Sequence, residues 1–166
     1  MTEETLAERV ARLEERVGAL EGAAPAAGRP EPAGAFWALD ALKERAAEPG
    51  AVLFTGSVTL PSGEHYEWQQ GHLAGDLLSD DWSQNAEALS ALAHPVRLLL
   101  LREILRGAGT TAELADHESL GTTGQLYHHL RQLVAAGWLR TTGRGRYSVP
   151  GERVVPILTV LAATRR

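Results

Sequence analysis

The 166-residue sequence predicts a mainly α-helical protein with a small β component. Apolar residues recur at helical spacing over most of the chain, whereas residues 51–70 alternate apolar with polar side chains. Eleven of the thirteen residues 22–34 are Ala, Pro or Gly, which is typical of a linker without a core. We therefore expect a short coiled-coil helix (1–21), a flexible linker (22–34), a helix and β-hairpin module (35–81) and a larger helical domain (82–166).

The N-terminal helix carries a heptad seam of Leu6, Val10, Leu13, Val17 and Leu20, spaced 4, 3, 4 and 3 residues apart. Val at the a positions with Leu at the d positions favours a parallel two-stranded coiled coil. The seam spans fewer than three heptads, so it is marginal by itself. The alternative is a surface helix that packs on its own domain, and the sequence leaves open whether the heptads pair in cis or between protomers.

The middle module begins with a helix predicted over Ala35 to Glu48 and closed by Pro49 and Gly50. Residues 51–70 then predict a β-hairpin, with Gly56 at a bulge or a close backbone approach. A lone hairpin is unstable in water, so its apolar face needs a helix to lie on, and the flanking helices are the candidates.

Aromatic residues concentrate in and beside this module. Such clusters line small-molecule pockets and supply large contact areas in interfaces, but they also form ordinary cores. The sequence thus predicts either a scaffold layer or a ligand or dimer surface formed by Phe54, Tyr66, Trp68 and Trp82.

Residues 82–166 follow the order helix, buried helix, short helix, capped helix, hairpin and apolar helix. Thr122 with Gln125 three residues later predicts a capping box at the start of the fourth helix. The hairpin has a basic tip at Arg144, which lies between two glycines. In the last helix, Pro156 fits only within the first turn, because proline lacks the N–H that later positions donate.

Charge is distributed unevenly along the chain. The whole sequence has a formal net charge of −5, but residues 91–166 contain ten basic and five acidic side chains, for a net charge of +5. This asymmetry indicates a polyanionic partner for the C-terminal half. The alternative is that solvated arginine-rich helix faces happen to collect there.

Several motifs of the C-terminal half resemble the DNA-binding domain of ArsR-like transcription regulators. Residues 91–97 (ALAHPVR) resemble its opening motif, residues 122–133 (TTGQLYHHLRQL) its recognition helix, and residues 136–139 (AGWL) with 143–147 (GRGRY) its helix-to-wing junction and wing. The resemblance covers about half of the chain. It implies a winged helix-turn-helix fold that binds double-stranded DNA as a homodimer and regulates transcription, as a repressor, in the bacterial cytoplasm.

The resemblance places the recognition helix at about 122–136 and the wing at about 138–149. A helix-turn-helix presents the first turns of its second helix to the major groove. There Gln suits adenine, Thr suits a thymine methyl, and Arg suits guanine or phosphate. His129 is expected to be structural, since it matches a partly buried family position. The candidate DNA-binding residues are Thr122, Thr123, Gln125, Tyr127, His128, Arg131, Arg144 and Arg146.

The composition argues against other chemistry. The absence of cysteine excludes disulfides, thiolate metal sites and a cysteine nucleophile, and residues 153–166 contain no Asp, Glu or His. The sequence therefore predicts no metal and no cofactor. An acidic cluster with His65 and His72 matches no metal-binding spacing, and no catalytic motif indicates an enzyme. The N-terminus lacks the apolar region of a signal peptide, and no apolar run is long enough to span a membrane.

Two alternatives stay open. The first is a protein-interaction adaptor whose winged helix no longer binds DNA, a protein that would show no salt-dependent DNA affinity. The second is a small-molecule sensor whose ligand pocket lies in the middle segment, with an unidentified small molecule or protein as its effector.

Overall fold

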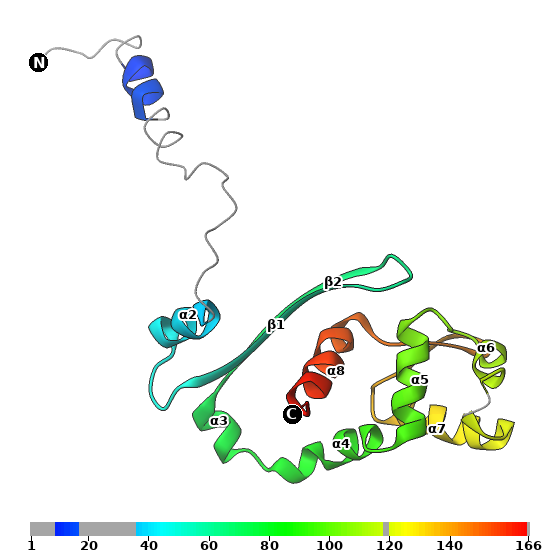
Figure 1. Ribbon diagram of the computed structural model, residues 1–166. Helices are drawn as coiled ribbons and strands as arrows, with labels where there is room; N and C mark the ends of the chain where they lie inside the picture. The colour runs from blue at the N-terminus through cyan, green and yellow to red at the C-terminus, as the bar shows by residue number, and fades with distance from the viewer. Residues whose placement is uncertain (1–8, 17–35, 118–119, 166) are drawn as a thin grey trace, which may run out of the picture. The chain divides into compact units, whose positions relative to one another are not determined.

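The computed structural model describes residues 9–16, 36–117 and 120–165, and the chain divides into two compact units at residues 44 and 45 (Figure 1). In the first unit, residues 9–16 are helical and expose Val10 and Leu13. The rest of the expected heptad seam and the linker 22–34 lie outside the described residues.

Helix α2 (Trp37–Arg45) is shorter than the predicted 35–48. The prediction of its end was wrong because proline disfavours helical conformation in the residue before it. The chain instead makes a turn in which the Gly50 N–H donates to the Ala47 carbonyl at 2.8 Å, and Gly50 adopts a φ of 112°.

The predicted first hairpin is confirmed. Strands β1 (Ala51–Thr59) and β2 (His65–Leu73) pair antiparallel from Ala51 opposite Leu73 to Thr59 opposite His65. The second strand continues three residues beyond the predicted end at residue 70. The Gly63 N–H donates to the Leu60 carbonyl at 2.9 Å, which closes the connecting turn.

The hairpin packs on α8 (Gly151–Ala163), which comes last in the sequence, rather than chiefly on a helix that flanks it (Figure 1). Gly56 is the point of closest approach, since a Cβ built there would lie 2.7 Å from Cγ1 of Val155. On the other strand, Tyr66 lies against Gly151, where an added Cβ would be 3.0 Å from the ring. Of the two readings of Gly56, the close backbone approach is therefore the correct one.

Two short helical segments follow the hairpin, and only the first was not predicted, since a helical pattern was expected from Trp82 onward. Helix α3 (Ala74–Ser79) continues directly from β2, and the 3₁₀ helix η1 (Trp82–Asn85) leads into α4 (Ala86–Leu92). The Asp81 carboxylate caps η1 by accepting a hydrogen bond from the Ser83 N–H at 3.0 Å.

The remaining elements surround one hydrophobic core. They are α5 (Pro95–Leu105), α6 (Thr111–Ala115), α7 (Thr123–Ala135), β3 (Arg140–Gly143), β4 (Arg146–Ser148) and α8. The most deeply buried side chains come from helices α5 to α8 and the loop before α7: Leu100, Leu101, Leu114, Leu120, Leu126, Leu130, Leu133, Val154 and Ile157. Among the described helices, none is long and apolar enough to cross a membrane.

The expected position of Pro156 was wrong. Helix α8 starts at Gly151, so Pro156 is its sixth residue and lies beyond the first turn. Proline supplies no N–H to the carbonyl four residues earlier, that of Glu152. Glu152 is exposed, so water can reach this end of the helix and hydrate the carbonyl.

Candidate nucleic-acid interface

Helices α6 and α7 each begin with a capping box, which fixes the backbone at the start of both. In α7, the Thr122 N–H donates to Oε1 of Gln125 at 3.0 Å and the Gln125 N–H donates to Oγ1 of Thr122 at 3.4 Å. This confirms the predicted cap. The cap of α6 was missed, although Thr110 followed by Glu113 has the same spacing, and the Thr110 N–H donates to Oε2 of Glu113 at 2.8 Å.

The two faces of α7 differ as expected for an amphipathic helix. Leu126, Leu130 and Leu133 are buried in the core. The opposite face is exposed and polar, and it includes the predicted residues Thr123, Gln125, Tyr127, His128 and Arg131.

Strands β3 and β4 form the second predicted hairpin, whose tip adds positive charge. Gly145 has a φ of 67°, a left-handed conformation that glycine adopts without strain. The Thr111 N–H donates to the Gly145 carbonyl at 2.9 Å, and the Tyr147 N–H donates to the Gly109 carbonyl at 2.8 Å. These bonds fix the hairpin to the start of α6. The exposed side chains of the hairpin include Arg140, Arg144 and Arg146.

One acidic side chain lies beside this basic hairpin. Hydrogen bonds from Thr110, with a smaller contribution from the charge of Arg146, hold the pKa of Glu113 below its ordinary value. Within the described part of the chain, Arg131 and Arg144 form no ion pair, so their charges are available to a partner.

A buried arginine holds α4 against α7. Arg97 on α5 donates from Nε to the Ala91 carbonyl at 2.6 Å and from Nη2 to the Ser90 carbonyl at 2.7 Å. It also donates from Nη1 to Oε1 of Gln132 on α7 at 3.2 Å. Arg97 belongs to the 91–97 motif, but the sequence predicts no role for it because its partners lie on two other elements.

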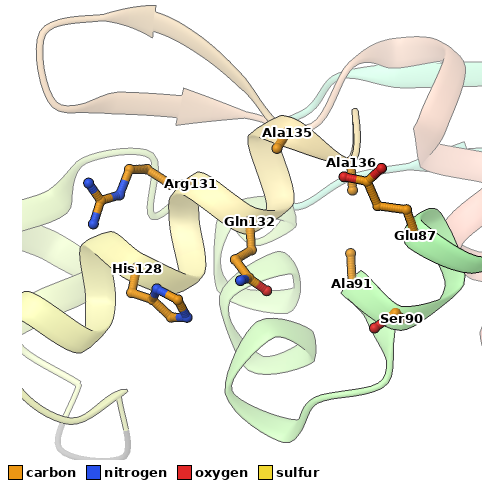
Figure 2. Close-up of a pocket in the computed structure, with 8 residues that line it drawn as sticks. All are labelled: Glu87, Ser90, Ala91, His128, Arg131, Gln132, Ala135 and Ala136. Carbon is orange, nitrogen blue, oxygen red and sulfur yellow. The ribbon is translucent and has the colours of Figure 1, made fainter.

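A groove of about 370 Å³ runs between α4 and α7. Figure 2 shows His128 and Arg131 extending from α7, with Gln132 lying between them and the α4 residues. Glu87 of α4 lines the far side of the groove, so its carboxylate marks one edge of the basic face.

Three histidine rings gather where α5 begins beside α7. The ring centroids of His94 and His129 are 4.6 Å apart, and those of His128 and His129 are 5.5 Å apart. Burial lowers the pKa of His129, and the neighbouring His94, Arg97 and His128 lower it further. Nδ1 of His129 is buried and makes no hydrogen bond. His129 is therefore partly buried, as expected, and its structural role stays a prediction.

The four aromatic residues expected to form one ligand or dimer surface are not brought together. Phe54 and Trp68 line one depression beside α8, Tyr66 packs on Gly151, and Trp82 lines a different cavity. Across residues 9–16, 36–117 and 120–165, no group of three His, Asp or Glu side chains has a geometry suited to a metal ion.

Helices α6 and α7 followed by the β3–β4 hairpin have the arrangement of a winged helix-like domain. No protein-family model matches the chain. Over 76 residues, it is 38% identical to a Streptomyces lividans protein described as a probable mercury resistance operon repressor. That match covers 44% of this chain and 60% of the Streptomyces protein.

A crystal structure of Rv0081 from M. tuberculosis superposes with a TM-score of 0.41 and 25% sequence identity, over 49% of this chain and 84% of that protein. The partial match to the Streptomyces protein makes this chain similar to a bacterial transcription regulator over less than half of its length.

Proposed function

We propose that this protein is a sequence-specific DNA-binding transcription regulator, similar to ArsR-like repressors, that acts in the bacterial cytoplasm and is not an enzyme. The observation that carries the proposal is the exposed polar face of α7, which begins in a closed capping box and stands beside a hairpin bearing three exposed arginines. The likeness to a mercury resistance operon repressor agrees with it.

The contacts divide into two groups. The first turns of α7, with Thr123, Gln125, Tyr127 and His128, read base edges in the major groove. Phosphate contacts come from Arg131, Arg144, Arg146 and the Thr122 hydroxyl, and they position the domain without reading the sequence. The wing thus binds the backbone beside the groove that α7 reads.

The regulator acts as a homodimer in this proposal. Leu161 near the end of α8 is exposed, and Val10 and Leu13 of the N-terminal helical segment are 45% and 55% exposed. A two-fold dimer covers such apolar surface and presents two copies of α7 to two half-sites. The half-sites then lie about one helical turn apart, roughly 10 bp.

Selection of bound sequences from a random duplex library tests the proposal. We expect enrichment of one pseudo-palindromic sequence, and a relaxed preference at one position of each half-site in Gln125→Ala, whose side chain is proposed to read a base. Recovery of the unselected pool by the folded wild-type protein would contradict DNA recognition and favour the adaptor alternative.

A further inference from the structure

A second cavity lies away from α7, on the side of the domain formed by α3, η1, α4 and α8. Its volume is about 480 Å³, within the range of small-molecule sites. Its apolar walls are Leu77, Trp82, Ala88, Leu89, Trp138 and Val160. Helix α3, which helps to close one side, was not predicted from the sequence.

The two tryptophans of this cavity already have partners for their polar atoms. Nε1 of Trp82 donates to the Leu77 carbonyl at 2.6 Å, and Nε1 of Trp138 donates to the Ala88 carbonyl at 2.8 Å. Their indole N–H groups therefore need nothing from a ligand, and the rings offer apolar surface for stacking.

The polar groups at the cavity are Arg153, Asp80 and Asn85. The Arg153 guanidinium carbon lies 5.0 Å from the centre of the Trp138 ring, which orients the cation at the wall. Within the described residues, Arg153 forms no ion pair, with Asp80 or with any other carboxylate. An oriented, unpaired guanidinium next to two aromatic walls is complementary to a planar anion.

We infer that this cavity binds a small hydrophobic carboxylate, whose apolar body lies between Trp82, Leu89 and Trp138 and whose carboxylate pairs with Arg153. Apolar and aromatic walls with a few oriented polar groups are the general form of a small-molecule site. The inference rests on the cavity alone and not on the proposed DNA binding. It is independent of the expected surface at Phe54, Tyr66 and Trp68, with which it shares only Trp82.

Calorimetric titration of the full chain with 1-naphthoate and with neutral 1-naphthamide tests the inference. The two probes have the same ring system and differ in charge. We expect saturable binding of one naphthoate per chain, about tenfold or more tighter than the amide, because the carboxylate adds a charge-assisted hydrogen bond. Absence of saturable naphthoate binding, or equal affinity for both probes, would overturn the inference.

Two variants with matched controls locate the site. Arg153→Gln should remove the preference for naphthoate, whereas Arg165→Gln, which removes the same charge from the exposed C-terminal end, should keep it. Leu89→Trp should fill the cavity and weaken both probes, whereas Leu78→Trp on exposed α3 should not. Thermal unfolding of each variant establishes that it is folded.

Sedimentation with and without naphthoate distinguishes a ligand site from a protomer interface. We expect the oligomeric state to stay the same when naphthoate binds. If naphthoate instead dissociates a dimer, and Leu89→Trp does the same, a second copy of the chain occupies the cavity and the inference is wrong. DNA binding is not measured in any of these tests, so their failure is distinct from failure of the proposed function.

Discussion

The side-chain oxygen of Gln125 accepts a hydrogen bond from the Thr122 N–H at 3.0 Å and closes the first turn of α7. The same side chain is proposed to read a base. Pairing with adenine uses both the oxygen and the nitrogen of a glutamine amide. Base reading by Gln125 therefore requires its side-chain oxygen either to accept a second hydrogen bond or to give up the one from the Thr122 N–H. DNA recognition is thereby coupled to the capping of the α7 N-terminus.

Gln125→Glu separates capping from base reading. A glutamate keeps the oxygen acceptor for Thr122 and favours the helix N-terminus, so the free energy of unfolding in urea should stay at the wild-type value or rise slightly. DNA affinity should fall at least about tenfold, because a carboxylate repels phosphate and has no N–H for adenine. Gln125→Ala is the comparison variant. It removes the cap, so its free energy of unfolding should be about 0.5–1 kcal/mol lower than that of the wild type. Undiminished DNA binding by Gln125→Glu would place base reading elsewhere.

Gly56→Ala should force the hairpin away from α8. The new Cβ would lie 2.7 Å from Cγ1 of Val155, and overpacking of this kind destabilises a protein by about 1–3 kcal/mol. The measurement is urea unfolding followed by fluorescence.

Gly71→Ala on the partner strand is the matched control. Its nearest neighbour would be Cδ1 of Leu53 at 3.6 Å, an ordinary contact, so this substitution should be neutral or slightly stabilising. Val155→Ala combined with Gly56→Ala should restore part of the lost stability. If Gly56→Ala is as mild as Gly71→Ala, the hairpin does not pack tightly on α8.

Arg97→Met should lower the free energy of unfolding by about 1–3 kcal/mol, because it leaves the buried carbonyl of Ala91 and the partly buried carbonyl of Ser90 without their donor. Arg102→Met on the same helix removes an exposed side chain paired with Glu103 and should change stability by less than about 1 kcal/mol. Equal effects of the two substitutions would mean that Arg97 does not hold α4 and α7 together.

Protonation of His129 should destabilise the fold below about pH 6.5, the ordinary pKa of the side chain. The native state lowers the pKa of His129, so the unfolded state binds the proton first as the pH falls. Stability is therefore unaffected above this pH and declines below it, until the native pKa is reached. Unfolding free energies from pH 5 to 8 for the wild type and His129→Gln measure this, and the variant should lose that part of the pH dependence. If the unfolding free energy of His129→Gln changes with pH as steeply as that of the wild type, other groups cause the pH dependence.

Features set by local chemistry were predictable from the sequence. The Thr122 and Gln125 cap and the two hairpins depend on residues that are close in the sequence. The interactions that form a cap or a hairpin turn act over a few residues, so the sequence pattern alone indicates them.

Features set by distant contacts were not predictable. The hairpin lies on α8, about 100 residues later, because Val155 fills the space left by Gly56. Arg97 has its acceptors on α4 and α7, and Arg153 on α8 contacts the ring of Trp138, which precedes β3. The candidate DNA-binding face was predictable because helical periodicity separates it from the buried leucines, whereas the second cavity is assembled from four elements.

The salt dependence of affinity for a duplex DNA tests the central claim most directly. Each arginine that neutralises a phosphate contributes about 0.9 to the slope of log K against log salt concentration. We predict that the wild type binds duplex DNA at low salt and that Arg131→Ala/Arg144→Ala makes the slope shallower by about 3–4 per bound dimer, because two arginines are lost from each protomer. Arg153→Ala/Arg165→Ala, which removes the same net charge from α8 and its C-terminal end, should leave the slope unchanged. No binding by the folded wild type, or the same slope change in both variants, would contradict DNA binding through α7 and the β3–β4 hairpin.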